Sequence, residues 1–342
     1  MKLSDRLKAG AEAGIISAEQ AKALDVFITE KSDFSDAESV HFARGFHDIF
    51  LSIGIIILLV GVSTSAALII EDYAGFVGAG LAWLLAEFYT RSRNLVLPSI
   101  VLSAAFVLMT AYSTAEIIRD FMPGLSGSGS DLLFPLVALA ASSFFLARFR
   151  LPFAYGLVAA SASAVLISTV TTFTPNSYQN YDYSLSLMAG LICFSCAMMF
   201  DLADPKRESL KADNAFWLHL CAAPLIVHSA TSKLADIGLE MSKGQAFTIL
   251  AVLTALGFVA LVIDRRAILV SGLAYLGIAI AALFSGSELH GTEVTGITLL
   301  LLGAAIVALG TGWRTARRIV IDNIIPARLS AHLPIIRAGS NE

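Results

Sequence analysis

The sequence has few charged residues for its length. Charged side chains make up 15% of the 342 residues and hydrophobic ones 56%, whereas a soluble globular protein has about 25% and about 45–50%. Such a chain is neither an intrinsically disordered protein nor an ordinary cytosolic enzyme. It also lacks a basic excess, since 23 Lys and Arg face 27 Asp and Glu and the net charge is −4. Nucleic-acid binding requires cations for the phosphate backbone, so this class is excluded as well.

Cysteine is scarce too, and the three residues Cys193, Cys196 and Cys221 all lie in apolar stretches. Cys193 and Cys196 are three positions apart and share one face of a helix. A zinc site needs about four well-placed ligands, so we expect all three cysteines to be small packing residues. The sequence contains neither a Gly-rich phosphate loop ending in Lys-Ser/Thr nor a His-Glu-x-x-His motif. We therefore expect no metal and no cofactor.

Long apolar stretches are what the sequence has in abundance. A helix needs about 20 residues to cross roughly 30 Å of hydrocarbon, and a helix satisfies its own backbone hydrogen bonds, as lipid requires. Ten stretches are predicted to span the membrane: Ile49–Ile70, Tyr73–Thr90, Leu95–Ile118, Leu132–Ala147, Leu151–Thr174, Ser184–Phe200, Ala215–Thr231, Gln245–Ile263, Ala267–Ser285 and Val294–Trp313. The sequence thus predicts an all-α, polytopic helical membrane protein with about ten transmembrane helices.

The basic residues of the loops predict the orientation of these spans. Cytoplasmic loops collect Lys and Arg. With the N-terminus inside, 20 basic residues fall on the cytoplasmic side and 3 on the outer side. Omitting the shortest span, Leu132–Ala147, would invert the six spans that follow and place most of the basic pairs outside. The charge pattern therefore favours ten spans with both termini in the cytoplasm.

Three regions follow from this topology. Residues 1–46 form a cytoplasmic segment of short amphipathic helices, residues 47–313 the transmembrane bundle, and residues 314–342 a basic, amphipathic cytoplasmic tail. None of the polar pieces is large enough for a catalytic domain, so we expect that the protein is not an enzyme. The lipid bilayer is its predicted surrounding, and the helices of residues 1–46 offer a surface for a protein partner.

Polar residues within the spans are the candidate functional residues, because ionisable groups are costly at membrane depth. Glu87 lies near the inner end of the second span, four residues before Arg91, in the order typical of a helical ion pair. The seventh span carries His219 and His228 on either side of Pro224. Nine residues turn a helix by about 180° beyond whole turns, so the two imidazoles point to opposite faces. They are candidates for a proton relay, or alternatively for hydrogen bonds between helices.

Small and hydroxylated residues predict how the spans pack. Alanine, glycine and cysteine at every fourth position form three ridges that allow close helix contacts: Ala74, Gly78, Ala82 and Ala86; Ala189, Cys193 and Ala197; and Ala304, Ala308 and Gly312. The fifth span is rich in hydroxyls, from Ser161 to Thr174. These hydroxyls either line a polar path or bond the carbonyls of their own helix four residues earlier.

Two stretches resemble a known family. Residues 14–21, with the sequence GIISAEQA, resemble the N-terminal helix signature of a family of bacterial polytopic membrane proteins of unknown function. The stretch from Ala215 through His219 to His228, and the closing Gly310–Arg314 with Arg317, are similar to rhizobial-type relatives of that family. The resemblance implies a multi-pass protein of the bacterial inner membrane, and it implies no activity, substrate or catalytic residue.

Two functional hypotheses remain. The first is a transporter-like permease for a small solute, based on ten spans, short loops and a polar seventh span interrupted by Pro224. The alternative is a non-transporting scaffold or sensor whose N-terminal helices bind a partner. The scarcity of charge within the spans favours the alternative, because ion-coupled carriers use such residues at mid-membrane. A polar cavity beside His219 or His228 would favour transport, and a closely packed bundle the alternative.

Overall fold

The fold was analysed in a computed structural model, which describes residues 7, 10–24, 46–121, 130–174, 178–205, 207, 209–232, 242–284 and 291–325. By its contacts the chain divides into two units, one of residues 1–40 with 335–342 and one of residues 41–334. Helices account for 92% of the described residues, and these residues form no strand. The predicted all-α fold is confirmed.

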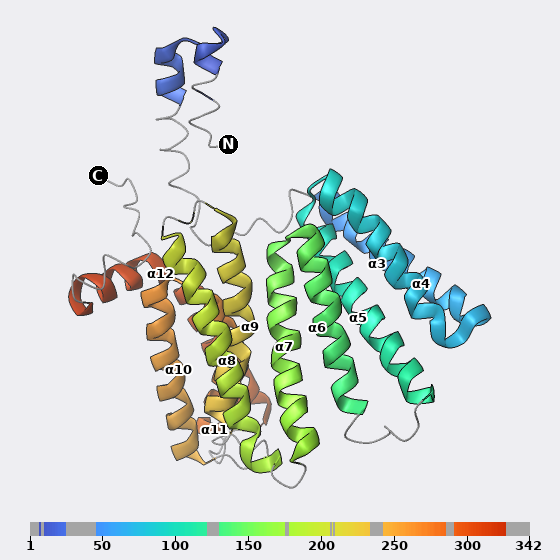
Figure 1. The fold of residues 1–342 in the computed structure, drawn as a ribbon. Helices are drawn as coiled ribbons and strands as arrows, with labels where there is room; N and C mark the ends of the chain where they lie inside the picture. The colour runs from blue at the N-terminus through green and yellow to red at the C-terminus, as the bar shows by residue number, and fades with distance from the viewer. Residues whose placement is uncertain are drawn as a thin grey trace. The chain divides into compact units, whose positions relative to one another are not determined.

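The larger unit is a series of helices that alternate in direction along the chain (Figure 1). In order they are α3 (Phe46–Ile70), η1 (Glu71–Tyr73), α4 (Ala74–Ala86), η2 (Glu87–Ser92), α5 (Val96–Phe121), α6 (Ser130–Phe149), α7 (Pro152–Phe173), α8 (Tyr178–Ala203), α9 (Leu210–Ser232), α10 (Lys243–Ile263), α11 (Ala267–Phe284) and α12 (Gly291–Ile324). Each predicted span coincides in position with one of the helices α3 to α12.

Seven helices of the described residues are long and apolar enough to cross a membrane. They occupy Phe46–Ile70, Val96–Phe121, Leu132–Phe149, Pro152–Phe173, Tyr183–Ala203, Lys243–Ile263 and Gly291–Ile324. The second predicted span is less regular than the sequence indicates, because α4 has 13 residues and continues as the π-helical turn η2. At the other end of the bundle, α12 continues without a break past Trp313, where the sequence predicts a change from span to tail.

The packing order places α9 in the interior of the second half of the bundle. Helices α3, α4 and α5 pack on one another, and α5, α6 and α7 follow as neighbours. Helix α7 also packs on α8 and α9, while α9 contacts α7, α8, α10 and α11. Helix α9, at the position of the seventh predicted span, therefore packs on four other helices, as expected of a central helix.

Small residues decide how closely the helices approach. The ridges on α4 and α8 are buried, with Ala82, Ala86 and Ala197 fully enclosed, as the sequence predicts. Gly190 on α8 lies so close to α9 that an added Cβ would be 2.8 Å from Ile226. The third predicted ridge is wrong: Ala304 and Ala308 are exposed, because α12 packs on α10 and α11 through other faces.

The smaller unit is described only from Gly10 to Leu24, apart from Leu7. Gly14 has a φ of +71°, a left-handed conformation that ends the short helical turn before it. Ser17 then begins the next helix with a capping box, since the Gln20 amide donates to the Ser17 hydroxyl at 3.1 Å and the Ser17 amide donates to the Gln20 side chain at 2.9 Å. The rest of the predicted segment 1–46 before Phe46 lies outside the described residues.

Candidate functional site

The most polar part of the described bundle is built around the turn between α10 and α11. Helix α10 is capped at its C-terminal end by Asp264, which has a φ of +57° and donates its amide to the carbonyls of Ala260 and Leu261. Glycine is the usual residue in this left-handed position, and aspartate is one of the few others that adopt it readily. An aspartate here closes the helix and also provides a carboxylate for neighbouring segments.

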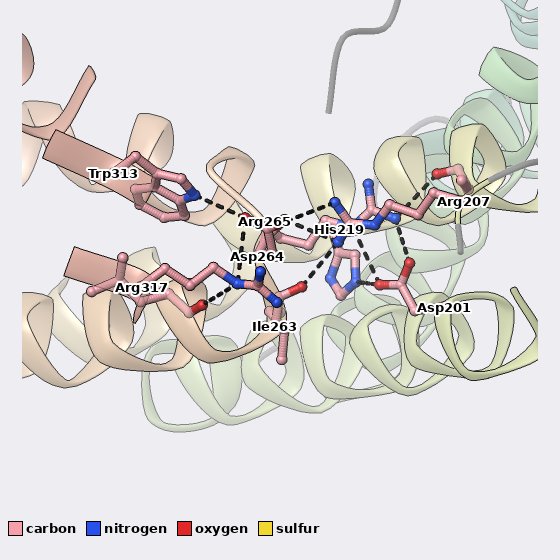
Figure 2. A network of polar contacts seen from close by, with 10 residues as sticks. Asp201, Arg207, His219, Ile263, Asp264, Arg265, Trp313 and Arg317 are labelled. Carbon is pink, nitrogen blue, oxygen red and sulfur yellow. Dashed lines mark hydrogen bonds and ion pairs between the residues drawn. The ribbon is translucent and has the colours of Figure 1, made fainter. Parts of the chain in front are cut away.

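Three side chains from distant parts of the chain contact the Asp264 carboxylate (Figure 2). The indole Nε1 of Trp313 donates to it at 2.8 Å, Arg207 donates from Nη1 at 3.2 Å, and Nε of Arg317 lies 3.6 Å away. The two arginines also bond backbone carbonyls, Arg207 those of Ile263 and Asp264 and Arg317 that of Leu261. Asp264 thus joins α12 and the α8–α9 turn to the end of α10.

The next residue, Arg265, forms a second cluster on the other side of the turn. Its guanidinium bonds both carboxylate oxygens of Asp201, from Nε at 3.2 Å and from Nη2, and donates to the Ala212 carbonyl at 3.2 Å. Nε2 of His219 lies 2.8 Å from the same carboxylate. Arg265, His219 and Asp201 are 1%, 0% and 6% exposed, so this cluster is shielded from the surroundings.

The electrostatics of the two clusters favour an ionised and closed arrangement. Asp201 and Asp264 face the three arginines Arg207, Arg265 and Arg317. Burial of an ion is costly, and the cost is offset only where the partner and further hydrogen bonds are in good geometry. Here bidentate and backbone contacts supply that geometry. Five segments of chain, from α8, the α8–α9 turn, α9, the α10–α11 turn and α12, are held together by these contacts.

The second ring nitrogen of His219, Nδ1, takes no part in the hydrogen bonds of this cluster. An ionised carboxylate only accepts hydrogen bonds, so the proton of a neutral His219 resides on Nε2, facing Asp201. Its Nδ1 is buried and has no hydrogen-bond partner among the described residues. Such an atom is unusual in a folded protein and is the feature of this site that its packing does not explain.

The other predicted site residues lie apart from this network. The Nδ1 of His228 contacts the hydroxyl of Tyr275 on α11, and its ring lies 6.4 Å from that of Tyr183 on α8. Both imidazoles of α9 thus have a neighbour on α8. His228 is exposed, so the expectation that both imidazoles are interior is wrong for this residue. It contacts α11 from the edge of the interface between α9 and α11. Pro224 is also exposed and borders a groove against α7.

Glu87 belongs to a separate pair at the end of α4. It lies 3.6 Å from Arg91, as the spacing predicts, but its closer partner is Arg148 of α6 at 2.8 Å. All three side chains are partly exposed, with Glu87 at 31%. This pair joins α4 to α6 at the helix ends and is not part of the buried network.

The hydroxyls of the fifth span bond their own helix. Ser163, Thr169 and Thr174 each donate to the carbonyl four residues earlier, at 2.8, 2.7 and 2.6 Å. Of the two alternatives for this span, the structure supports the intrahelical one at these positions. Beside them, Cys193 lies 3.6 Å from Ser163 and also contacts Cys221, and within the described residues no group of three His, Cys, Asp or Glu side chains could hold a metal ion.

The sequence analysis identified His219 and missed its partners. Asp201, Asp264 and Arg265 lie at the ends of apolar stretches, where charges are expected merely as markers of orientation. The signal that could have found them is the pairing of acid and base in these turns, Asp264 directly before Arg265 and Asp201 before Arg207. The positive-inside rule accounts for Lys and Arg at the helix ends but not for Asp, so an acid beside these arginines indicates a further role.

Comparisons with known proteins add no relative: no protein-family model matches the chain, and neither a curated protein nor a solved structure is significantly similar to it. The resemblance of residues 14–21 to a family signature therefore stays a prediction. Arguments about function rest on the residues themselves.

Proposed function

We propose that the chain is an integral protein of the bacterial inner membrane with ten spans and both termini in the cytoplasm. The alternating directions of α3 to α12 support an even number of crossings (Figure 1). The described basic residues of the larger unit gather at the ends where α4, α6, α8, α10 and α12 finish. Eleven lie there, namely Arg91, Arg93, Arg148, Arg150, Arg207, Lys211, Arg265, Arg266, Arg314, Arg317 and Arg318, and two, Arg119 and Lys243, lie at the opposite ends.

For the activity, a non-transporting sensor or scaffold agrees best with the geometry. The observation that carries this proposal is that the buried charges around the α10–α11 turn bond one another in a closed network at the helix ends. A carrier needs polar groups that exchange their partners for a solute, whereas Asp201 and Arg265 are committed to each other. The intrahelical bonds of the fifth-span hydroxyls and the apolar lining of three surface grooves support the same proposal.

A partner for the sensor or scaffold would bind residues 1–46. In the described part of this segment, the apolar side chains of Ile15 and Leu24 are 79% and 41% exposed. Exposed apolar side chains on short amphipathic helices are suited to contact with another protein or with the membrane surface.

The second candidate, a permease for a small solute, is favoured by the bare Nδ1 of His219. A buried acceptor without a donor could serve a solute or a proton during transport. The two proposals differ in whether water reaches the middle of α9 from either side of the membrane.

Accessibility of α9 to a membrane-impermeant maleimide tests this difference without knowledge of a substrate. Cysteine is introduced for Ala222, which is 1% exposed, in a variant in which the three native cysteines are replaced by alanine. For a scaffold or sensor, position 222 should stay unlabelled in both right-side-out and inside-out vesicles. Cysteine in place of Ser209, an exposed residue of the α8–α9 turn, is the positive control for the cytoplasmic side. Labelling of position 222 from both sides would instead establish the permease.

A further inference from the structure

An apolar groove opens between α10 and α11 on the surface of the bundle. It has a volume of about 400 Å³ and is lined almost entirely by aliphatic and aromatic side chains and by two glycines, Gly257 and Gly272. A Cβ at Gly257 would lie 3.5 Å from Leu269 of the facing helix, so a larger side chain at this position would occupy the groove. In a membrane, a groove on the lipid-facing surface is filled by hydrocarbon, because no water is present at that depth.

One end of the groove adjoins the turn that carries the charge network. Leu261 and Ile268 line this end, three residues before and after the turn centred on Asp264 and Arg265. Leu309 of α12 lines it as well, one helical turn before Trp313. The guanidinium of Arg266 lies 5.3 Å from the centre of the Trp313 ring. Trp313 is 2% exposed and does not itself line the groove. Arg266, next to its ring, comes two residues before the lining residue Ile268. We call this end of the groove, at Ile268 and Leu309, its mouth.

The charge around this mouth is positive. Arg265 and Arg317 are paired with Asp201 and Asp264. Besides them, the turn and the last part of α12 contain three arginines, at positions 266, 314 and 318, and one aspartate, Asp322. Arg314 and Arg318 each follow one residue after a buried contact residue of the network, which places them about 100° round the helix. Both are exposed. The excess of cations is thus presented at the interface next to the groove.

We propose that this groove and its basic mouth bind an anionic glycerophospholipid, with an acyl chain between α10 and α11 and the phosphate beside Arg266 and Arg314. The apolar volume and the charge are complementary to the two ends of such a molecule. Basic pockets between transmembrane helices on the cytoplasmic side are suited to anionic headgroups. The proposal concerns a ligand site and holds for a scaffold, a sensor or a permease alike.

Native mass spectrometry of the full-length protein in detergent tests the proposal. Palmitoyl-oleoyl phosphatidylglycerol and the corresponding phosphatidylcholine are titrated separately, and the dissociation constant of the first lipid adduct is measured. We expect tighter binding of the phosphatidylglycerol. In the double variant Arg266→Gln/Arg314→Gln this binding should weaken by about fivefold for each arginine removed, as expected for cations near an anionic surface.

Two further variants separate the groove from general charge. Gly257→Leu fills the groove and should weaken the first adduct of both lipids. Arg93→Gln is the control. Arg93 is exposed, follows η2 and lies 5.4 Å from the centre of the Phe88 ring, so it resembles Arg266 beside Trp313 but is distant from the groove in the sequence. This substitution should leave the affinity for phosphatidylglycerol unchanged.

Four results would overturn the proposal: equal affinity for the two lipids, unchanged binding in the double arginine variant, unchanged binding in Gly257→Leu, or an equal loss in Arg93→Gln. A dimer that forms in competition with the lipid would also do so, because a second copy of the chain would then be the occupant. Each variant is first compared with the wild type by size-exclusion chromatography. If Arg266→Gln/Arg314→Gln does not fold, the result for Gly257→Leu decides.

Discussion

At the scale of single residues, Asp201 is the side chain on which two other buried groups depend. It accepts hydrogen bonds from Arg265 through both carboxylate oxygens and one from Nε2 of His219. Removing an acid from such a contact leaves a cation buried without compensation, and this is more costly than the pair itself is stabilising. The two predictions at this scale concern Asp201 and the two histidines.

Asp201→Ala should lower the free energy of unfolding by about 3–5 kcal/mol, the range for breaking a buried ion pair. The measurement is a reversible unfolding titration in mixed detergent micelles. Asp120→Ala, at an exposed position at the end of α5, is the matched control and should change stability by less than about 0.5 kcal/mol. Removing the orphaned cation as well, in Asp201→Ala/Arg265→Met, should recover part of the loss. A double variant less stable than Asp201→Ala would contradict this account of the cluster.

The two histidines should respond differently to substitution by leucine. His219 is fully buried and bonded to a carboxylate, so His219→Leu should cost about 1.5–3 kcal/mol, as for hydrogen bonds to charged groups. His228 is exposed and contacts a neutral hydroxyl, and His228→Leu should cost about 1 kcal/mol or less. The same unfolding titration compares them. An equal effect of the two substitutions would mean that the Asp201 contact contributes little.

At the scale of the helices, α8 and α9 approach each other closely at the small residue Gly190. At Gly190 an added Cβ would lie 3.0 Å from Cβ of Leu225 and 3.1 Å from the backbone nitrogen of Ile226. Backbone atoms cannot turn aside as a flexible side chain can. The separation of the two helices is therefore determined at this position, and with it the distance between Asp201 and His219.

Gly190→Ala should accordingly destabilise the protein by about 1–3 kcal/mol, the cost of overpacking a filled interior. Gly54 on α3 is the matched control, because nothing lies within 4 Å of its added Cβ. Gly54→Ala should be neutral or stabilising by up to about 1 kcal/mol, since alanine is the better helix former. Thermal unfolding of the two variants side by side distinguishes them, and equal stability would show that α8 and α9 can separate without loss.

The helices were easier to predict than the site, for a physical reason. Each predicted span coincides with a helix, because a membrane requires an apolar run that is visible in the sequence itself. The buried network joins Asp201 to Arg265 across 64 positions, and no local pattern indicates such a contact. His219 was found because it interrupts an apolar run. The exposed ridge around Ala304 was misjudged, since small residues permit close packing but do not specify a neighbour.

At the scale of the whole molecule, the distribution of the basic residues is the basis of the proposed orientation of the bundle. Positive residues of short loops are retained on the cytoplasmic side, and those of the described bundle gather at one set of helix ends. The N-terminal segment and the tail after α12 then belong to the same compartment if α3 to α12 all cross the membrane.

Reporter fusions provide the corresponding prediction. A reporter fused within residues 122–129, after α5, should be active outside the cytoplasm, and one fused after residue 342 should be active inside it. The control is a fusion after residue 150, in the turn between α6 and α7, which should report the inside. Reporters at 122–129 and 342 on the same side would show that an odd number of helices fails to cross between these positions.

The charge network also has a consequence for how the chain is made. Asp201 is synthesised 64 residues before Arg265, an interval of roughly 3–13 s at about 5–20 residues per second. Throughout that time the nascent chain holds an acid whose cationic partner does not yet exist. Its place near the end of α8 allows the carboxylate to remain in contact with water at the membrane boundary until the partner arrives. If translation stops before α12, the released chain lacks Trp313 and Arg317, the two partners of Asp264 on that helix. The charges that are buried in the complete protein are then accessible to the proteases of the cell.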